Sequence, residues 1–261
     1  MRKTLLMTAA ALAAGIISTQ AQVYSQNIVG YINVSVGGNG YALIGHQLDL
    51  GDGTNGISNV FATGLASDVN DVTNSQILLF NPVTSQYQTL FYFNAADAAT
   101  DWGGTSAGFY DQGGTFYNTP LPPGKAAFIY NPANANPLTV TMTGTVPQAT
   151  NIYTISQGYN LLSLTDPVVT NLCGSLANFT GTSDVNDVNN DQILLFNPVT
   201  SQYQTLFYFN ASDAATDWGG TSAGFYDQGG TFYPISQPVA SAFFINHIVA
   251  GTETWTNTFS F

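Results

Sequence analysis

A block of 51 residues occurs twice in this chain, and this repetition constrains the fold more than any other feature. Residues 67–117 return as residues 183–233, 116 positions later, with three differences. The differences are Thr73 against Asn189, Ser75 against Asp191 and Ala96 against Ser212. The chain is therefore a tandem repeat, and we expect two similar domains.

The similarity continues more weakly on both sides of the block. The matching segments are residues 40–45 (GYALIG) with 158–163 (GYNLLS), and residues 126–129 (AAFI) with 242–245 (AFFI). The join falls near Val146 and Pro147. We divide the mature chain into repeat 1, residues 22–146, and repeat 2, residues 147–261, each of ordinary domain size.

Residues 1–21 have the pattern of a cleaved secretory signal. Arg2 and Lys3 precede an apolar stretch from Leu5 to Ile17, and small residues follow as far as Ala21. The apolar stretch is too short to span a bilayer comfortably, and no second one follows it. We expect an exported protein in the extracellular space, at the cell surface or in the periplasm. We expect no transmembrane segment after cleavage.

Removal of the signal leaves Lys125 as the only basic residue against 15 acidic ones, a formal charge of −14. Such a chain has almost nothing with which to neutralise phosphate groups, so nucleic acid and anionic lipid are excluded as expected partners. Cys173 is the only cysteine, so no internal disulfide can form. A buried, small apolar side chain is the favoured interpretation of Cys173.

The composition favours β structure throughout. Charged residues make up 7% of the chain, hydrophobic residues 44% and aromatic residues 13%, which excludes a disordered protein. The strands expected in repeat 1 are residues 28–36, 41–48, 76–80, 86–93, 125–130 and 138–146. Short strands at this spacing predict an all-β fold of two tandem antiparallel β-sandwich or small-barrel domains, with little helix.

Residues 76–93 form the clearest expected hairpin, because Asn81 and Pro82 supply a turn between two apolar runs. Aromatic residues occupy both faces of its second strand, so we expect a central strand that is buried on both sides. Residues 94–117 contain five glycines and are expected to be a loop. A single helical turn is compatible with residues 57–62.

The duplicated loop is the candidate binding site. Its aromatic rings could stack on pyranose rings while its carboxylates accept hydrogen bonds from sugar hydroxyls. The candidate residues are Trp102, Tyr110, Asp101 and Asp111 in repeat 1, and Trp218, Tyr226, Asp217 and Asp227 in repeat 2. Core packing by the aromatic residues and turn formation by the aspartates are the competing interpretations, and both remain open.

Histidine gives no support to a repeated active site. His46 stands opposite Leu164, and His247 stands opposite Asn131, so neither histidine is duplicated. Paired aspartates beside a tryptophan resemble the acids of a glycosidase, but turn-forming aspartates have the same spacing. We therefore expect a protein that is not an enzyme.

Calcium is the only cofactor that the sequence suggests. The acidic segments could supply oxygen ligands from Asp68, Asn70 and Asp71 in repeat 1, and from Asp184, Asn186, Asp187 and Asp191 in repeat 2. The EF-hand pattern fails, because the sixth position is not glycine and the twelfth, Leu79 or Leu195, is not acidic. A looser oxygen site and a solvated turn remain the two interpretations.

The order of motifs resembles a class of exported bacterial β-domains with GYxLI and PGxxFFIxN patterns. The matching residues are Gly40, Tyr41, Leu43, Ile44, Leu121, Pro123, Gly124, Phe128, Ile129 and Asn131. The chain is similar in particular to uncharacterised secreted β-repeat proteins of Verrucomicrobia-type bacteria, which often begin with a segment like Val23–Val34. Repeat 2 departs from the pattern at residues 237–240, where QPVA replaces the Pro-Gly turn. The resemblance implies export and surface association, and no activity.

Three functions are compatible with these observations. The first is an exported, non-catalytic structural or adhesive protein of the cell surface, which could self-assemble because the segments QILLF and QTLFYF are uncharged and β-prone. The second is a carbohydrate-binding module that binds polysaccharide through both loops, with avidity from the two copies. The third is a carbohydrate-active enzyme.

Overall fold

The computed structural model describes residues 28–61, 63–69, 73–132, 136–148, 150–168, 170–171, 179, 181–185 and 189–258. It is mostly β, with 48% strand and 10% helix in several antiparallel sheets, which confirms the predicted all-β class. The predicted signal and Cys173 lie outside the described residues. Among the described residues, no helix has both the length and the apolar character needed to cross a membrane.

Repeat 1 contains a six-stranded sheet and a separate two-stranded ribbon. The sheet has the order β2 (Gly40–Gly45), β7 (Ala126–Asn131), β3 (Gln76–Asn81), β4 (Gln86–Phe93), β5 (Gly108–Tyr110) and β6 (Phe116–Tyr117). The ribbon pairs β1 (Val29–Val36) with β8 (Leu138–Thr145). All these pairings are antiparallel, as expected from the turn-rich sequence.

In repeat 2 the two strands that form the ribbon also belong to the main sheet, so ribbon and sheet are continuous. The five-stranded sheet has the order β13 (Gly224–Tyr226), β12 (Gln202–Phe209), β11 (Gln192–Asn197), β15 (Ala242–Thr258) and β9 (Thr150–Ser163). A short pair, β10 (Thr170–Asn171) with β14 (Ser236–Gln237), lies outside this sheet. The register of β15 against β9 shifts between His247 and Thr252, where the chain bends from sheet to ribbon.

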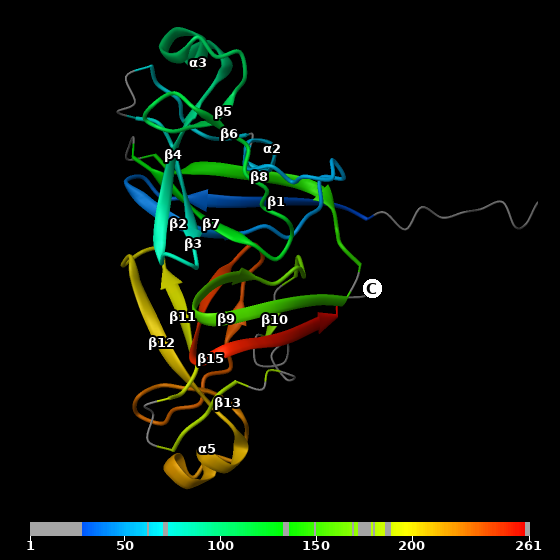
Figure 1. The fold of residues 1–261 in the computed structure, drawn as a ribbon, viewed down its shortest axis with the longest axis vertical. Coiled ribbons are helices and arrows are strands. Elements are labelled where there is room, and N and C mark those ends of the chain that lie inside the picture. Colours follow the sequence, from blue (N-terminus) through cyan, green and yellow to red (C-terminus); the bar gives the residue numbers. More distant parts are fainter. Residues whose placement is uncertain are drawn as a thin grey trace, which may run out of the picture.

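Each repeat packs its ribbon over its sheet around a core of its own, to which Ala240 of repeat 2 also contributes in repeat 1. In repeat 1, Val140 and Met142 of the ribbon share a core with Ile77 and Ile129 of the sheet. This alternation of apolar residues with threonines in β8 is the pattern expected of a strand with one buried face. The described strand pairings all stay within one repeat, and Figure 1 shows the two halves one above the other.

The hairpin of β3 and β4 confirms the prediction from its turn. The side chain of Asn81 accepts hydrogen bonds from the backbone N–H groups of Val83 and Thr84, at 2.9 and 3.3 Å. Strand β4 is central, between β3 and β5, as expected. Burial on both faces begins only at Leu90, however, and Tyr87 is 41% exposed. The first half of β4 therefore presents an aromatic side chain to solvent.

The expected loop at residues 94–117 begins instead with a helix, α3 (Ala95–Trp102). Asn94 caps it by accepting hydrogen bonds from the N–H groups of Ala96 and Asp97, and Gly103 ends it in the left-handed conformation. The glycines follow the helix rather than interrupt it, so their number in this segment wrongly predicted a loop from its first residue. Repeat 2 repeats this geometry in α5 (Ala211–Trp218). The single turn expected near residue 57 is α2 (Ile57–Val60).

The two repeats meet through equivalent faces. Their shared cluster of buried side chains contains Phe128 of repeat 1 and its counterpart Phe244 of repeat 2. Gln47, which is also buried, donates to the carbonyl groups of Leu164 and Asp166 and accepts from the N–H group of Ala240. Contact between the same surface of two similar units is the arrangement of a two-fold symmetric dimer.

Candidate functional site

Two tyrosines stand at the solvent edge of the contact between the repeats. Tyr87 lies on β4 and Tyr203 is its counterpart on β12, and both line the same two cavities. Both are about two-fifths exposed, although the neighbouring residues Phe128 and Phe244 are buried. Burial raises the pKa of both phenols, so each keeps its proton and can donate as well as accept a hydrogen bond.

Two equivalent cavities flank this tyrosine pair. The first has a volume of about 250 Å³ and is lined by Phe80, Ser85, Tyr87, Tyr159, Leu194, Tyr203 and Phe244. The second has a volume of about 220 Å³ and is lined by Tyr41, Leu78, Tyr87, Phe128, Phe196, Ser201 and Tyr203. Every residue of one cavity has its counterpart from the other repeat in the second cavity. We name the lining of these two cavities the junction surface.

Neighbouring aromatic rings hold the tyrosines of the junction surface in place. The ring of Tyr87 lies 5.3 Å from Phe80 and 5.9 Å from Phe128. The ring of Tyr203 repeats this arrangement, at 5.4 Å from Phe196 and 5.9 Å from Phe244. These are tilted or edge-on contacts of the kind that aromatic rings prefer. The lining residues carry no charge, so the junction surface suits a neutral ligand with both apolar and hydroxyl groups.

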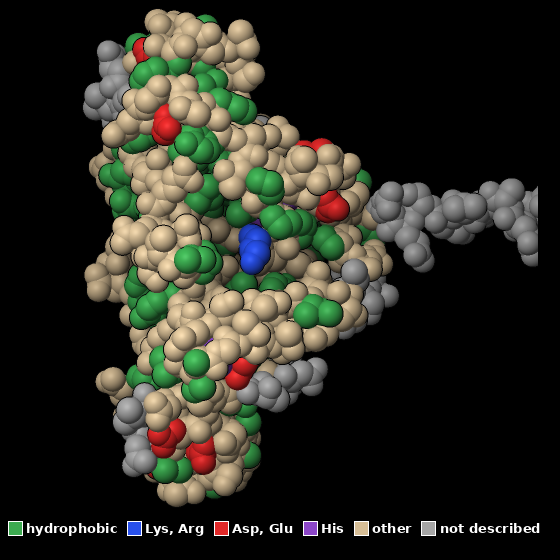
Figure 2. Space-filling model, viewed as in Figure 1, with side chains coloured by type: hydrophobic (Ala, Val, Ile, Leu, Met, Phe, Trp, Pro, Cys, Tyr) green, Lys and Arg blue, Asp and Glu red, His purple; other side chains and the backbone are tan. Residues whose placement is uncertain are grey.

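A further pair of cavities differs between the repeats. Figure 2 shows a basic side chain in the hollow between the two halves, and a cavity of about 270 Å³ there is lined by Lys125, Pro122 and Asn160, among others. The equivalent cavity has Ser241 in place of Lys125. Because only one of these two cavities carries the amine, a ligand that needs it would bind once per chain.

The loop residues predicted to bind sugar pack within their own repeats. Trp102 lies edge-on to Phe93, with 6.1 Å between ring centres, and covers Gly114, where a Cβ atom would come 2.4 Å from the indole. Tyr110 is buried and donates its hydroxyl hydrogen to the carbonyl of Ser106. Repeat 2 has the same contacts for Trp218 and Tyr226.

The aspartates of these loops have the geometry of turn residues. Asp111 accepts hydrogen bonds from the N–H groups of Gly113 and Thr115, both at 2.9 Å, which hold the pKa of its carboxyl below the usual range. Asp227 has the same environment in repeat 2. Asp101 and Asp217 lie next to the last residue of α3 and α5. Figure 1 shows these helices at opposite ends of the molecule, so the two loops do not come together.

The residues predicted to bind calcium do not form one described cluster. Asn70, Asp71, Asn186 and Asp187 lie outside the described residues. Asp68 accepts a hydrogen bond from Thr73, and Asp184 accepts one from Asn189. The carboxylate of Asp191 contacts His247 and accepts a hydrogen bond from the N–H group of Thr182.

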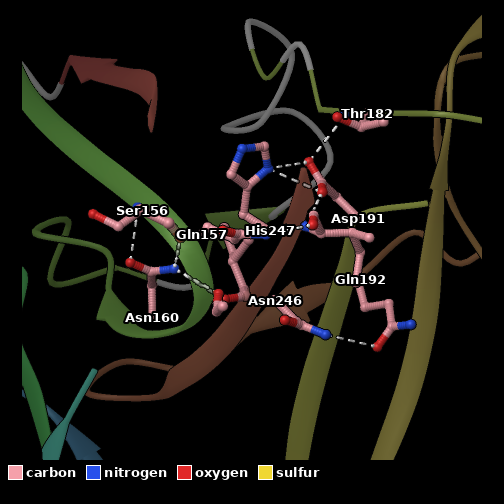
Figure 3. Close-up of polar contacts among 11 residues, drawn as sticks. Ser156, Gln157, Asn160, Thr182, Asp191, Gln192, Asn246 and His247 are labelled. Atoms are coloured by element: carbon pink, nitrogen blue, oxygen red, sulfur yellow. Dashed lines mark hydrogen bonds and ion pairs between the residues drawn. The ribbon is translucent and has the colours of Figure 1, made fainter. Parts of the chain in front are cut away.

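Asp191 and His247 form a buried polar pair in repeat 2 (Figure 3). His247 Nδ1 lies 3.0 and 3.1 Å from the two carboxylate oxygens of Asp191. Those oxygens also accept hydrogen bonds from the backbone N–H groups of Thr182 and Ile248, both at 2.9 Å. A potential ligand atom of Glu253 lies within 4.8 Å of both side chains.

Glu253 completes this cluster with a buried carboxylate oxygen. Its Oε2 atom has no hydrogen-bond partner among the described residues, and burial together with the nearby Asp191 carboxylate raises its pKa. Sequence reasoning set His247 aside because it is not duplicated, and assigned Asp191 to the calcium segment. The sequence does mark both residues, because the repeats differ at these positions: His247 stands opposite Asn131, and Asp191 stands opposite Ser75.

Comparisons with models of protein families, with curated proteins and with solved structures find no match to this chain. The resemblance to secreted β-repeat proteins therefore stays a prediction.

Proposed function

We propose that this protein is an exported, non-catalytic adhesive protein that binds neutral polysaccharide chains at the junction surface. The observation that carries this proposal is the pair of equivalent cavities on either side of Tyr87 and Tyr203. The proposal keeps the predicted carbohydrate ligand and moves the binding site from the two end loops to the contact between the repeats.

The chemistry of the junction surface supports a sugar ligand. Pyranose rings have an apolar face of C–H groups, which stacks on an aromatic ring, and a rim of hydroxyls. Tyr87, Tyr159 and Tyr203 are each about two-fifths exposed, so each can offer an aromatic ring and a phenol hydroxyl to a ligand. Ser85 lines the first cavity, and Ser201 lines the second.

The pairing of the cavities supports a polymeric ligand. Two equivalent cavities that share a wall can hold two units of one chain, and the second unit then binds at a high effective concentration. A weak individual contact is enough for adhesion under these conditions. Because glycoside hydrolysis needs a pair of carboxyl groups, cavity linings without an acidic residue favour binding over hydrolysis.

A glycan array and a polysaccharide pull-down with the mature chain test this proposal. We expect binding to at least one neutral polysaccharide, and a loss of roughly tenfold or more in affinity for Tyr87→Ala combined with Tyr203→Ala. Trp102→Ala combined with Trp218→Ala is the matched control, since these residues lie at the same positions of the two repeats but far from the junction. Circular dichroism verifies that each variant is folded.

Two results would contradict the proposal. One is the absence of binding to any neutral glycan at high protein concentration. The other is binding that survives the tyrosine substitutions and is lost in the folded tryptophan variant, which would return the site to the end loops.

Self-assembly is a second candidate function, and exposed apolar residues on one strand edge favour it. Among the described strands, β1 pairs only with β8, and its residues Val29 and Tyr31 are 76% and 67% exposed. An apolar edge strand is a template for pairing with another chain. Light scattering should show oligomers of the mature chain that Tyr31→Lys disperses, whereas a strictly monomeric wild-type chain would remove this candidate.

A further inference from the structure

The shape of β15 brings Asp191, His247 and Glu253 together. Six residues of extended strand span about 20 Å, yet ligand atoms of His247 and Glu253 lie within 4.8 Å of one another and of Asp191. The register shift between His247 and Thr252 bends the strand and makes this approach possible. Asp191 directly precedes β11, which is the neighbour of β15 in the sheet.

We propose that Asp191, His247 and Glu253 bind one divalent transition-metal ion of the zinc type. One imidazole nitrogen and two carboxylate oxygens are a ligand set that zinc accepts, and metal ligands of this kind bind in their deprotonated form. Nδ1 of His247 faces the Asp191 carboxylate, so the ion would take the place of the proton between them. Water or an external group would supply the remaining ligand.

The unpartnered oxygen of Glu253 supports this assignment. Oε2 is buried and accepts no hydrogen bond within the described part of the chain, and a buried carboxylate oxygen without a partner is costly. A cation at the cluster would satisfy it. The backbone N–H groups of Thr182 and Ile248 fix the orientation of the Asp191 carboxylate, as hydrogen-bond donors to ligand side chains do at metal sites.

In repeat 1, other residues occupy the positions equivalent to Asp191, His247 and Glu253. Ser75 Oγ accepts a hydrogen bond from the N–H group of Ala66, and Asp191 accepts the equivalent bond from Thr182, both at 2.9 Å. Asp191 thus keeps the structural role of the serine and adds an oxygen that faces His247. The counterpart of His247, Asn131, bonds to the carbonyl of Asn136 instead. Strand β8 carries no acidic residue, so repeat 1 has no counterpart of Glu253.

Zinc titration of the mature chain, prepared without a histidine tag and stripped with a chelator, tests the proposal. Isothermal titration calorimetry and metal analysis should give one Zn²⁺ per chain. The variant Asp191→Ser with His247→Asn installs the residues of repeat 1, with which this backbone already folds. We expect its affinity for Zn²⁺ to fall by at least about tenfold.

Glu253→Gln is a second variant that does not depend on that substitution being tolerated. It removes the ligand at nearly constant volume, and we expect a similar loss of at least about tenfold. Asp184→Asn, in the predicted calcium segment, is the matched control and should bind Zn²⁺ like the wild type.

Three results would overturn the proposal. They are no Zn²⁺ binding by the wild-type chain, equal binding by all variants, and binding that is lost only in Asp184→Asn. In the first two cases the three residues form only a buried hydrogen-bonded cluster. In the third, the metal is held by the calcium segment.

Discussion

Repeat 1 and repeat 2 share an almost identical block of 51 residues, but the strands packed around that block differ. In repeat 1 the ribbon of β1 and β8 is a separate sheet, whereas in repeat 2 it is continuous with the main sheet through β9 and β15. The ribbon of repeat 1 fills its core with Val140 and Met142, and that of repeat 2 uses Tyr153 and Trp255. The block thus folds in the same way although the ribbons packed against it carry different core residues.

The reason is that the block carries its own local determinants. Asn81 and Asn197 close the same hairpin turn, and Asn94 and Asn210 cap the same helix with φ of −71° and ψ of 167° in each. Contacts outside the block were therefore free to diverge. At one of the three differences within the block, Asp191 stands in place of Ser75 and its carboxylate contacts His247.

Trp255→Ala should have the largest effect and should break the core of repeat 2. Trp255 is fully buried and stacks on Tyr153, with 4.7 Å between ring centres. We expect a loss of about 3–5 kcal/mol in the free energy of unfolding. Met142→Ala in repeat 1 should cost about 2–5 kcal/mol. Urea denaturation measures both, and a tryptophan variant as stable as the wild type would contradict the packing described for repeat 2.

Gln47→Ala should have the next largest effect, because it breaks the contact between the repeats. It removes the hydrogen bonds that Gln47 makes to two carbonyl groups and one N–H group of repeat 2, and a buried polar group left unpaired costs about 1–3 kcal/mol. We expect a loss of at least about 2 kcal/mol in chemical denaturation. Gln88→Ala, on the exposed part of β4, is the control and should change stability by less than about 0.5 kcal/mol.

His46 should make the stability of repeat 1 depend on pH. Burial holds its pKa below the usual value of 6.5, so the folded chain favours the neutral imidazole and the unfolded chain takes up the proton first. Stability is therefore complete above about pH 6.5 and falls below it, by at most about 1.4 kcal/mol per pH unit. His46→Leu, which installs the residue of repeat 2, should remove this contribution from unfolding curves measured between about pH 5 and pH 8. An unchanged slope would show that His46 does not titrate on unfolding.

The helix caps should have the smallest effect, and an equal one in both repeats. Asn94→Ala and Asn210→Ala each remove a side chain that accepts two hydrogen bonds from backbone N–H groups, and each should cost about 1 kcal/mol. Thermal unfolding of the two variants measures this directly. A clear difference between them would show that the identical block is not energetically equivalent in its two settings.

The sequence predicted those features that depend on neighbouring residues. The duplicated block, the turn at Asn81 and the strand expected at residues 138–146 follow from local chemistry, and the structure confirms the turn and has strand β8 at Leu138–Thr145. The helix at Ala95–Trp102 was missed because the glycines after it were counted and the capping residue Asn94 before it was not. Asn94 is a preferred N-cap residue and Asp97 is an acidic residue in the first turn, so the sequence does contain the signals of a helix start.

The candidate sites could not be predicted, because they depend on contacts between residues distant in the sequence. Alternation along β4 shows which side chains share a face with Tyr87, but not that this face meets the other repeat. Likewise, Asp191 and His247 are 56 residues apart, and only the bend in β15 brings Glu253 to them. The duplication supports the prediction of the fold, but as a guide to function it favours duplicated residues over residues that occur once, such as Asp191 and His247.

One titration tests most directly whether the repeats bind as a unit. A soluble oligosaccharide from the bound polysaccharide is titrated calorimetrically into the mature chain and into Tyr203→Ala. Because both cavities of the junction surface share Tyr203, we expect this single substitution in repeat 2 to weaken every binding event. A variant that keeps the wild-type affinity but binds half as many ligands would instead show that each repeat binds independently, and would contradict a shared site.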